Sequence, residues 1–142
     1  MRMKKTVTTL ATAAAVGAAG LLGLSATPAA AAGVDFDYGR ATNVAGIDAW
    51  QDSRMRGSVT WQIDAMSDGS KGDTLCVKDH YRDGVYVVAT TGEGHRVSTK
   101  GHGSGYVKCM TRNVPEGMPT TMRLSLHGAN GTVTSSPMKI HG

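Results

Sequence analysis

The side chains of this 142-residue chain that could carry chemistry are five histidines, two cysteines and a few carboxylates. The histidines are His80, His95, His102, His127 and His141. No HxH, HExxH or His-plus-Cys spacing joins any of them, and such spacings are what metal sites require. Three aspartates, Asp64, Asp68 and Asp73, also miss the spacing of a calcium-binding loop. The sequence therefore predicts no metal site and no cofactor.

The enzyme class closest to this size and composition is a small secreted ribonuclease. Such an enzyme needs a glutamate base, a histidine acid and arginines around a phosphate, and Glu93, His95 and Arg96 are close enough in sequence to keep this alternative open. A hydrolase is not favoured, because Ser104 lacks the glycines two residues before and after it that a nucleophile elbow requires. We predict a non-enzymatic protein with no catalytic residues.

The N-terminal residues have the three parts of a secretory signal peptide. Met1 to Lys5 is cationic, Val7 to Leu24 is apolar, and Ser25 to Gly33 is rich in small residues. We expect a signal peptide over residues 1–32, with cleavage near Ala32 or Gly33. An uncleaved membrane anchor is the alternative, but the glycine content and the small-residue exit favour cleavage. The predicted location is therefore extracellular, with no membrane association after cleavage.

The charge of the remaining chain says little about partners. The chain has 15 Lys and Arg against 11 Asp and Glu, and losing Arg2, Lys4 and Lys5 with the leader leaves 12 against 11, a net charge of +1. No basic run follows the leader. Since nucleic-acid binding depends on clustered positive charge, the sequence predicts no nucleic-acid partner.

Cys76 and Cys109 are the only cysteines of the chain. Export would place them in an oxidising compartment, where an even pair is typically a disulfide. The bridge would close a loop of about 34 residues and restrict the unfolded chain by roughly 3 to 4 kcal/mol. We predict the disulfide Cys76–Cys109.

From residue 57 onward, short apolar–polar alternations are separated by glycine-rich turns. The pattern predicts about seven strands and no helix. The expected strands are Ser58 to Met66, Thr74 to His80, Val85 to Thr91, His95 to Thr99, Tyr106 to Thr111, Thr121 to His127 and Thr132 to Ile140. Tight hairpins are expected at Asp83-Gly84 and Asn130-Gly131, and Pro137 places the last strand at an edge or a bulge. The predicted fold class is an all-β, small antiparallel β-sandwich, immunoglobulin-like or jelly-roll, with one disulfide and an extended N-terminal segment.

Residues 33–56 differ from the predicted sandwich domain at 57–142, because their alternation of aromatic and acidic residues gives way to a mixed stretch. Two interpretations stay open. The segment is either an ordinary first strand that covers the sandwich, or an extended arm that docks into another protein. On the second interpretation, Phe36, Tyr38 and Trp50 are the apolar anchors for a partner, and deleting the segment would leave thermal unfolding nearly unchanged.

The alanine-rich leader, the β-rich body with two cysteines and the glycine-rich turns resemble the small secreted β-sandwich proteins of filamentous actinomycetes. The resemblance covers Gly57 to Ile140. It implies either the adaptor subunit of antibacterial umbrella toxin particles or a secreted protease inhibitor, for which Lys108 and Met110 beside Cys109 are the candidate loop. We therefore expect a secreted protein-binding module of interbacterial competition. Its partners would be other secreted proteins, either toxin-complex subunits or a protease.

Overall fold

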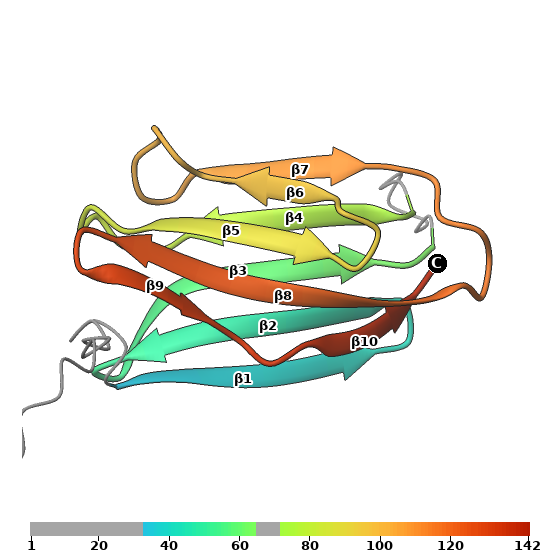
Figure 1. Ribbon diagram of the computed structural model, residues 1–142, viewed down its shortest axis with the longest axis horizontal. Helices are drawn as coiled ribbons and strands as arrows, with labels where there is room; N and C mark the ends of the chain where they lie inside the picture. The colour runs from blue at the N-terminus through green and yellow to red at the C-terminus, as the bar shows by residue number, and fades with distance from the viewer. Residues whose placement is uncertain (1–32, 65–71) are drawn as a thin grey trace, which may run out of the picture.

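A computed structural model describes residues 33–64 and 72–142 of the chain. The predicted leader at 1–32 and most of the expected loop at 67–73 lie outside the described residues. The described residues form ten strands in two facing antiparallel sheets (Figure 1). The strands are β1 (Val34–Ala41), β2 (Val44–Gln51), β3 (Arg54–Gln62), β4 (Thr74–Asp79), β5 (Tyr86–Thr91), β6 (Arg96–Ser98), β7 (Val107–Thr111), β8 (Pro119–Gly128), β9 (Gly131–Thr134) and β10 (Met138–His141). No helix in this part of the chain has the length and apolar character needed to cross a membrane.

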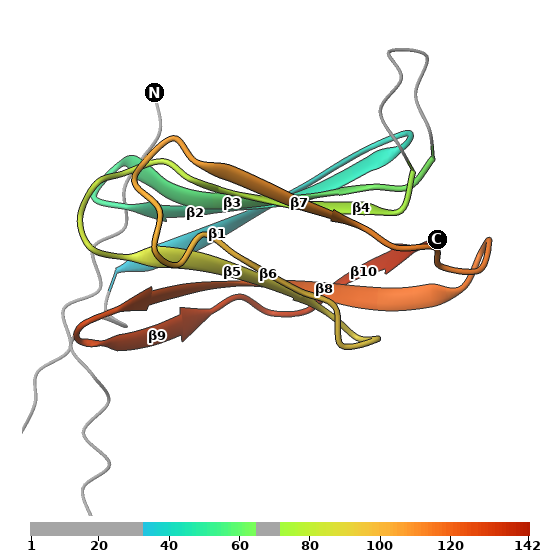
Figure 2. The ribbon, with the colours of Figure 1, turned by 90° about the horizontal axis from the view of Figure 1, so that it is seen from above.

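The two sheets are the layers of a sandwich, which Figure 2 shows edge-on. Sheet A has the strand order β1-β2-β3-β4-β7, and sheet B has the order β10-β8-β5-β6, with β9 also paired to β8. The chain runs through four consecutive strands of sheet A and then crosses between the sheets at β4–β5, β6–β7 and β7–β8. The predicted fold class, an antiparallel β-sandwich with one disulfide, is confirmed.

Alternation along the strands fills the space between the sheets with apolar side chains, because every second residue of a strand faces the same side. The core includes Trp61 and Val59 of β3, and Leu124 and Met122 of β8, all of them buried. The indole Nε1 of Trp61 donates a hydrogen bond to the carbonyl of His141 at 2.9 Å. This bond joins the centre of sheet A to the edge strand β10 of sheet B.

Residues 34–51 are part of this core. They form β1 and β2, and the inward side chains Ala45, Ile47 and Ala49 of β2 are completely buried. The expected domain boundary after residue 56 falls inside β3, which begins at Arg54. Of the two interpretations left open by the sequence, the structure shows the ordinary strand, since β1 pairs with β2 along its whole length.

A strand lies at each of the seven places expected after residue 57, and the last expected strand is divided in two. Residues 65–66 of the first expected strand lie outside the described residues. β9 and β10 pair with different parts of β8, and the chain between them leaves the ladder at residues 135–137. There, the backbone N–H of Ser135 donates to the Leu124 carbonyl, while the Ser135 hydroxyl accepts the Leu124 N–H. Pro137 therefore lies at an interruption of an edge strand, as expected from its missing N–H.

One expected hairpin is wrong. Asp83-Gly84 does not join two paired strands, because β4 belongs to sheet A and β5 to sheet B. The local turn chemistry is present: the Asp83 carboxylate accepts the Val85 N–H at 2.9 Å, and Gly84 has a φ of 78°. The same carboxylate pairs with Arg56 of β3. The turn signal was therefore correct, but it marks a crossing between the sheets. The Asn130-Gly131 hairpin joins β8 to β9 as expected.

Candidate functional site

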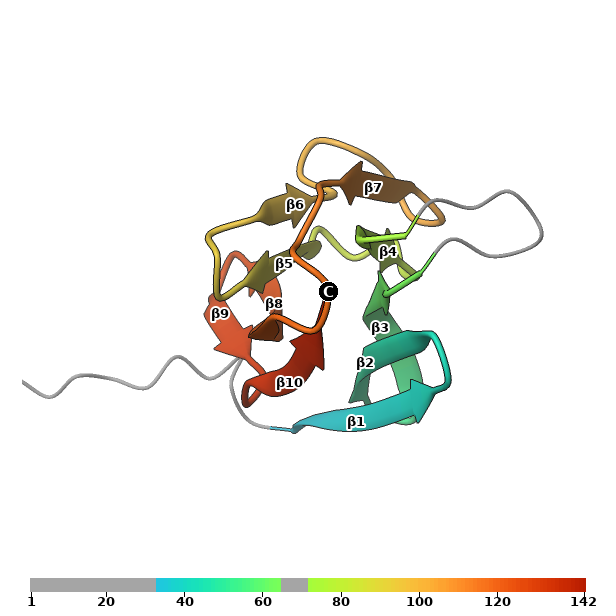
Figure 3. The ribbon, with the colours of Figure 1, turned by 90° about the vertical axis from the view of Figure 1, so that its right-hand side faces the viewer.

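Strand β7 is the most exposed strand in the described part of the molecule. All five of its residues are exposed, on both faces of the strand. Val107 is 49% exposed and Met110 is 37% exposed. The cause is position: β7 is an edge of sheet A, and the strand beside it in the other layer, β6, has only three residues (Figure 3). Two apolar side chains are thus presented to solvent on an extended backbone.

The outer edge of β7 also presents unpaired backbone groups. In an antiparallel ladder, successive residues point their N–H and C=O groups alternately toward and away from the neighbouring strand. At the ends of the β4–β7 ladder, the Tyr106 carbonyl accepts the Asp79 N–H, and the Arg112 N–H donates to the Asp73 carbonyl. Residues 106, 108, 110 and 112 therefore bond toward β4. The backbone groups of Val107, Cys109 and Thr111 point to the free edge, where another strand could pair.

The predicted disulfide is confirmed, and it fixes this edge. Cys76 and Cys109 are direct partners in the β4–β7 register, with their Cα atoms 4.0 Å apart. Leu75 and Val77 of β4 are buried, so the bridge lies on the outer face of sheet A. Beside it, the hydroxyls of Thr74 and Thr111 are hydrogen bonded at 2.9 Å. Because β7 buries little of its own surface, these two links hold it in an extended, pre-formed conformation.

The charged residues along β7 are basic. Lys108 lies on the strand, Arg112 follows it, and Lys78 is the direct partner of Val107 on β4. Within the described ranges the only ion pair joins Arg56, near the start of β3, to Asp83. These three cations therefore have no carboxylate partner there, and the edge complements an acidic segment better than a basic one.

The predicted partner anchors do not form one surface. Phe36 and Tyr38 share a face of β1 with the buried side of β2, and Phe36 packs against the core. Tyr38 is 45% exposed, with its hydroxyl directed at the Ser136 carbonyl 3.5 Å away. Trp50 is paired with Asp35 and lies on the opposite, outer face of sheet A. Its indole Nε1 is buried and has no hydrogen-bond partner among the described residues.

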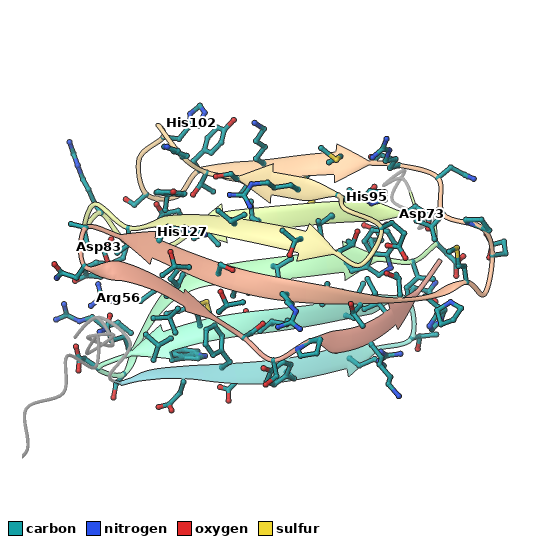
Figure 4. The ribbon with its side chains drawn as sticks, in the orientation of Figure 1. Arg56, Asp73, Asp83, His95, His102 and His127 are labelled. Atoms are coloured by element: carbon teal, nitrogen blue, oxygen red, sulfur yellow. A yellow bond between two sulfur atoms is a disulfide. The ribbon has the colours of Figure 1, made fainter. Side chains whose placement is uncertain are left out.

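Of the residues of the ribonuclease alternative, Arg96 is directed away from His95. His95 is buried on the inner side of the β5–β6 hairpin, whereas the next residue, Arg96, points to the outer face. Partial burial acts to raise the pKa of Glu93, but hydrogen bonds and the nearby His95 outweigh it and lower the pKa. A carboxylate stabilised in this way is a weaker general base. The labelled histidines His95, His102 and His127 also lie apart from one another (Figure 4).

A serine–histidine pair that the sequence did not reveal lies on the outer face of sheet A. The Ser58 hydroxyl and His80 Nε2 are 2.9 Å apart. Burial, followed by the charge of Lys78, lowers the pKa of His80, and burial raises the pKa of Asp48 nearby. No hydrogen bond joins His80 to a carboxylate in the described chain, so the third member of a catalytic triad is missing. No spacing rule could have found this pair, because the register between β2, β3 and β4 brings it together.

Metal-ligating side chains do not gather in the residues that the structure describes: no group of three His, Cys, Asp or Glu could hold an ion. Of the three aspartates considered for calcium, Asp68 lies outside the described residues, and Asp73 accepts the Val114 N–H at 3.0 Å. Comparisons with protein-family models, curated proteins and solved structures find no match to this chain. The chain stands as a small all-β protein of two sheets with one disulfide.

Proposed function

We propose that this chain is a secreted, non-enzymatic protein-binding module, and that its contact is the free edge of β7. One observation carries the proposal: β7 is an extended edge strand, exposed on both faces, held in place by a disulfide and flanked by unpaired cations. Its three outward backbone positions can pair with a strand from another protein. Strand addition of this kind takes its affinity from main-chain hydrogen bonds and its specificity from alternate side chains.

The side chains of β7 define what the added segment would look like. Val107 lies on the outer side with the disulfide, and Met110 lies on the inner side, so an apolar side chain of the partner could cover each of them. The cations Lys78, Lys108 and Arg112 favour carboxylates in the partner. The expected partner segment is therefore extended, partly apolar and acidic. An adaptor subunit of an extracellular antibacterial toxin complex would use such an edge to hold another secreted subunit.

A secreted protease inhibitor is the second candidate. It is supported by the position of Lys108 and Met110, which lie in an exposed extended segment on either side of the disulfide-bonded Cys109. A protease binds its substrate as an extended strand, so the same edge could occupy a substrate cleft. This candidate predicts stoichiometric loss of activity in a secreted protease.

The test is an affinity pull-down from culture supernatant with the tagged protein, read by mass spectrometry. Met110→Glu introduces a negative charge at the edge and should reduce recovery of the partner at least tenfold. Met118→Glu is the matched control, because Met118 is equally exposed, at 42%, but lies in the loop before β8. Val107→Pro removes only an outward N–H and should also weaken binding.

The outcomes separate the candidates. Retention of a large secreted subunit by the unmodified protein and by Met118→Glu, but not by Met110→Glu, supports the adaptor. Retention of a protease alone, with loss of its activity, supports the inhibitor. Equal retention by Met110→Glu and Met118→Glu would show that β7 is not the contact.

A further inference from the structure

The outer face of sheet B has a composition unlike the rest of the surface. The inner face of this sheet is given by its buried residues, such as Val87, Ala89 and Leu124. Direct cross-strand partners share a face, as do residues two apart along a strand. The outer positions are therefore Tyr86, Val88, Thr90, Arg96, Ser98, Thr121, Arg123, Ser125, His127, Thr132, Thr134 and Lys139. None of them is acidic, and six are Ser or Thr.

The cations on this face are placed in register. Arg96 of β6 and Arg123 of β8 are both direct partners of Thr90, on either side of β5. Two strand spacings separate their backbones, a distance of about 10 Å. Lys139 of β10 is paired with Thr121, one step along the same face from Arg123. The face thus carries a line of positive charge that crosses four strands.

These cations are not neutralised within the described chain. Its one ion pair, Arg56–Asp83, lies at the end of the sandwich and involves none of them. Their positive charge also affects His127: burial lowers its pKa first, and Arg96 and Lys100 lower it further. The sequence predicted no nucleic-acid partner, because no basic run follows the leader. It missed the cluster because the contributing residues are far apart in the chain and meet only through strand pairing.

The chemistry of the face selects among anionic partners. A protein or a membrane would need apolar anchors, but Val88, the only aliphatic residue here, is 1% exposed. Single-stranded nucleic acid would need a free aromatic ring on which bases stack. The Tyr86 ring is already stacked on His127 at 4.9 Å and approached by Lys100 at 5.5 Å. The side chains of Ser98, Ser125, Thr132 and Thr134 already form hydrogen bonds within the chain. What remains is the row of cations with the hydroxyls of Thr90 and Thr121 beside them, which suits a polymer that is both anionic and rich in hydroxyls.

We propose that the outer face of sheet B binds an acidic polysaccharide. The guanidinium groups of Arg96 and Arg123 meet carboxylate or sulfate groups on the polymer, since a guanidinium binds such groups through paired N–H donors. Their separation is comparable with the length of a disaccharide, so acidic groups on alternate sugars would reach both. The hydroxyl of Thr90, which lies between them, and that of Thr121 beside Lys139 hydrogen bond the sugar hydroxyls. This face belongs to the other sheet from β7, so it can fail or succeed independently of the proposed protein-binding edge.

The test measures the binding of labelled heparin oligosaccharides and labelled oligogalacturonate to the purified protein by fluorescence anisotropy. Arg96→Gln combined with Arg123→Gln should weaken binding at least tenfold. The slope of log K against log salt should fall by about 1 to 2, since two ionic contacts are lost. The matched control is Lys108→Gln with Arg112→Gln, which removes the same charge from β7. It should change the affinity less than twofold.

Further measurements keep the result unambiguous. Arg96→Lys with Arg123→Lys keeps the charge and should restore part of the affinity, and thermal unfolding of every variant checks the fold. Equal weakening by the β7 control would overturn the proposal, because it would show attraction by net charge alone. So would tighter binding to an oligo-dT strand, co-sedimentation with phosphatidylglycerol vesicles that Arg96→Gln removes, or no binding to either oligosaccharide.

Discussion

Gly57 of β3 lies directly against side chains of sheet B. A Cβ atom there would lie 2.6 Å from Cγ2 of Val87 and 3.1 Å from Cδ2 of Leu126. Val87 is completely buried and β-branched, so its methyl group cannot move aside by rotation. The absence of a side chain at Gly57 is therefore a packing requirement of the sandwich.

Gly57→Ala should lower the free energy of unfolding by about 1 to 3 kcal/mol, the usual cost of overpacking a core. Urea denaturation at equilibrium measures the change. Gly39→Ala is the matched control on the exposed strand β1, because a Cβ there meets nothing within 4 Å. It should leave stability unchanged or raise it slightly. Similar losses for the two variants would contradict the packing argument.

His80 gives the stability a dependence on pH whose sign follows from its environment. Burial and then Lys78 lower its pKa in the folded protein, against weaker opposing effects of Asp48 and Asp79. The unfolded chain therefore binds more protons as the pH falls through about 6.5. The contribution of His80 to the free energy of unfolding should be fully present above that pH and decrease below it. The pKa of Asp48 is raised, so its protonation stabilises the folded protein as the pH falls. This opposite effect occurs at lower pH, near the range in which carboxyl groups normally titrate.

His80→Gln should therefore flatten the decrease in stability between pH 8 and pH 5.5. The measurement is the urea midpoint of the wild type and the variant across this range. His127 has a lowered pKa as well, caused by burial and then by Arg96 and Lys100, so the double variant with His127→Gln should be flatter still. An unchanged slope in the double variant would show that neither histidine controls the acid response.

At the scale of single elements, β7 depends on its covalent link more than on packing. It pairs with β4 alone and is exposed on both faces. Replacing both Cys76 and Cys109 by Ser should lower the free energy of unfolding by about 3 kcal/mol. The loss of stability should be larger in β7 than in the rest of the sandwich. Amide hydrogen exchange should show lost protection at Lys108 and Met110, while β3 and β8 stay protected. Loss of protection throughout the molecule would show that β7 belongs to the cooperative core.

The sequence predicted the strands better than it predicted their partners. Alternation in β3, β4 and β8 was sufficient to identify them, because each buries one apolar face. The β2–β3 hairpin was missed because its turn has no glycine: Asp52 and Ser53 adopt positive φ values of 52° and 60°. Because this hairpin was not predicted, residues 33–56 had no expected strand partner. Deleting that segment should now unfold the protein, since it would remove Ala45, Ile47 and Ala49 from the core.

The candidate site was even less accessible to sequence reasoning. The cysteine count predicted the disulfide. It did not predict that the disulfide holds an edge strand, because that depends on the pairing of β7 with β4 in sheet A. The partner anchors were predicted only from their being aromatic, but Phe36 packs against the core. The exposure of β7 has a different origin: Val107 lies on the outer face of sheet A, and the short strand β6 leaves Met110 uncovered on the inner face. Long-range topology, which local patterns do not encode, decides all three features.

Over the whole molecule, the formal net charge of +4 does not show that two faces differ in character. The outer face of sheet A carries Asp35, Asp37 and Asp48 near β1, while the outer face of sheet B carries the aligned cations. Two surfaces on different sheets can serve two partners at once without competing. Such separation suits an adaptor: the β7 edge would hold a protein while sheet B faces outward.

The two layers should nevertheless unfold as one unit. They share a single apolar core, and the hydrogen bond from Trp61 to the His141 carbonyl ties β3 to β10 across it. Trp50→Phe leaves Trp61 as the only tryptophan of the chain, so its fluorescence reports the core alone. In urea, that signal and the far-UV circular dichroism should give coincident transitions, the mark of two-state unfolding. If the circular dichroism persisted after Trp61 became exposed to water, one sheet would be stable without the other. The sandwich would then consist of two separable layers, each able to present its outer face alone.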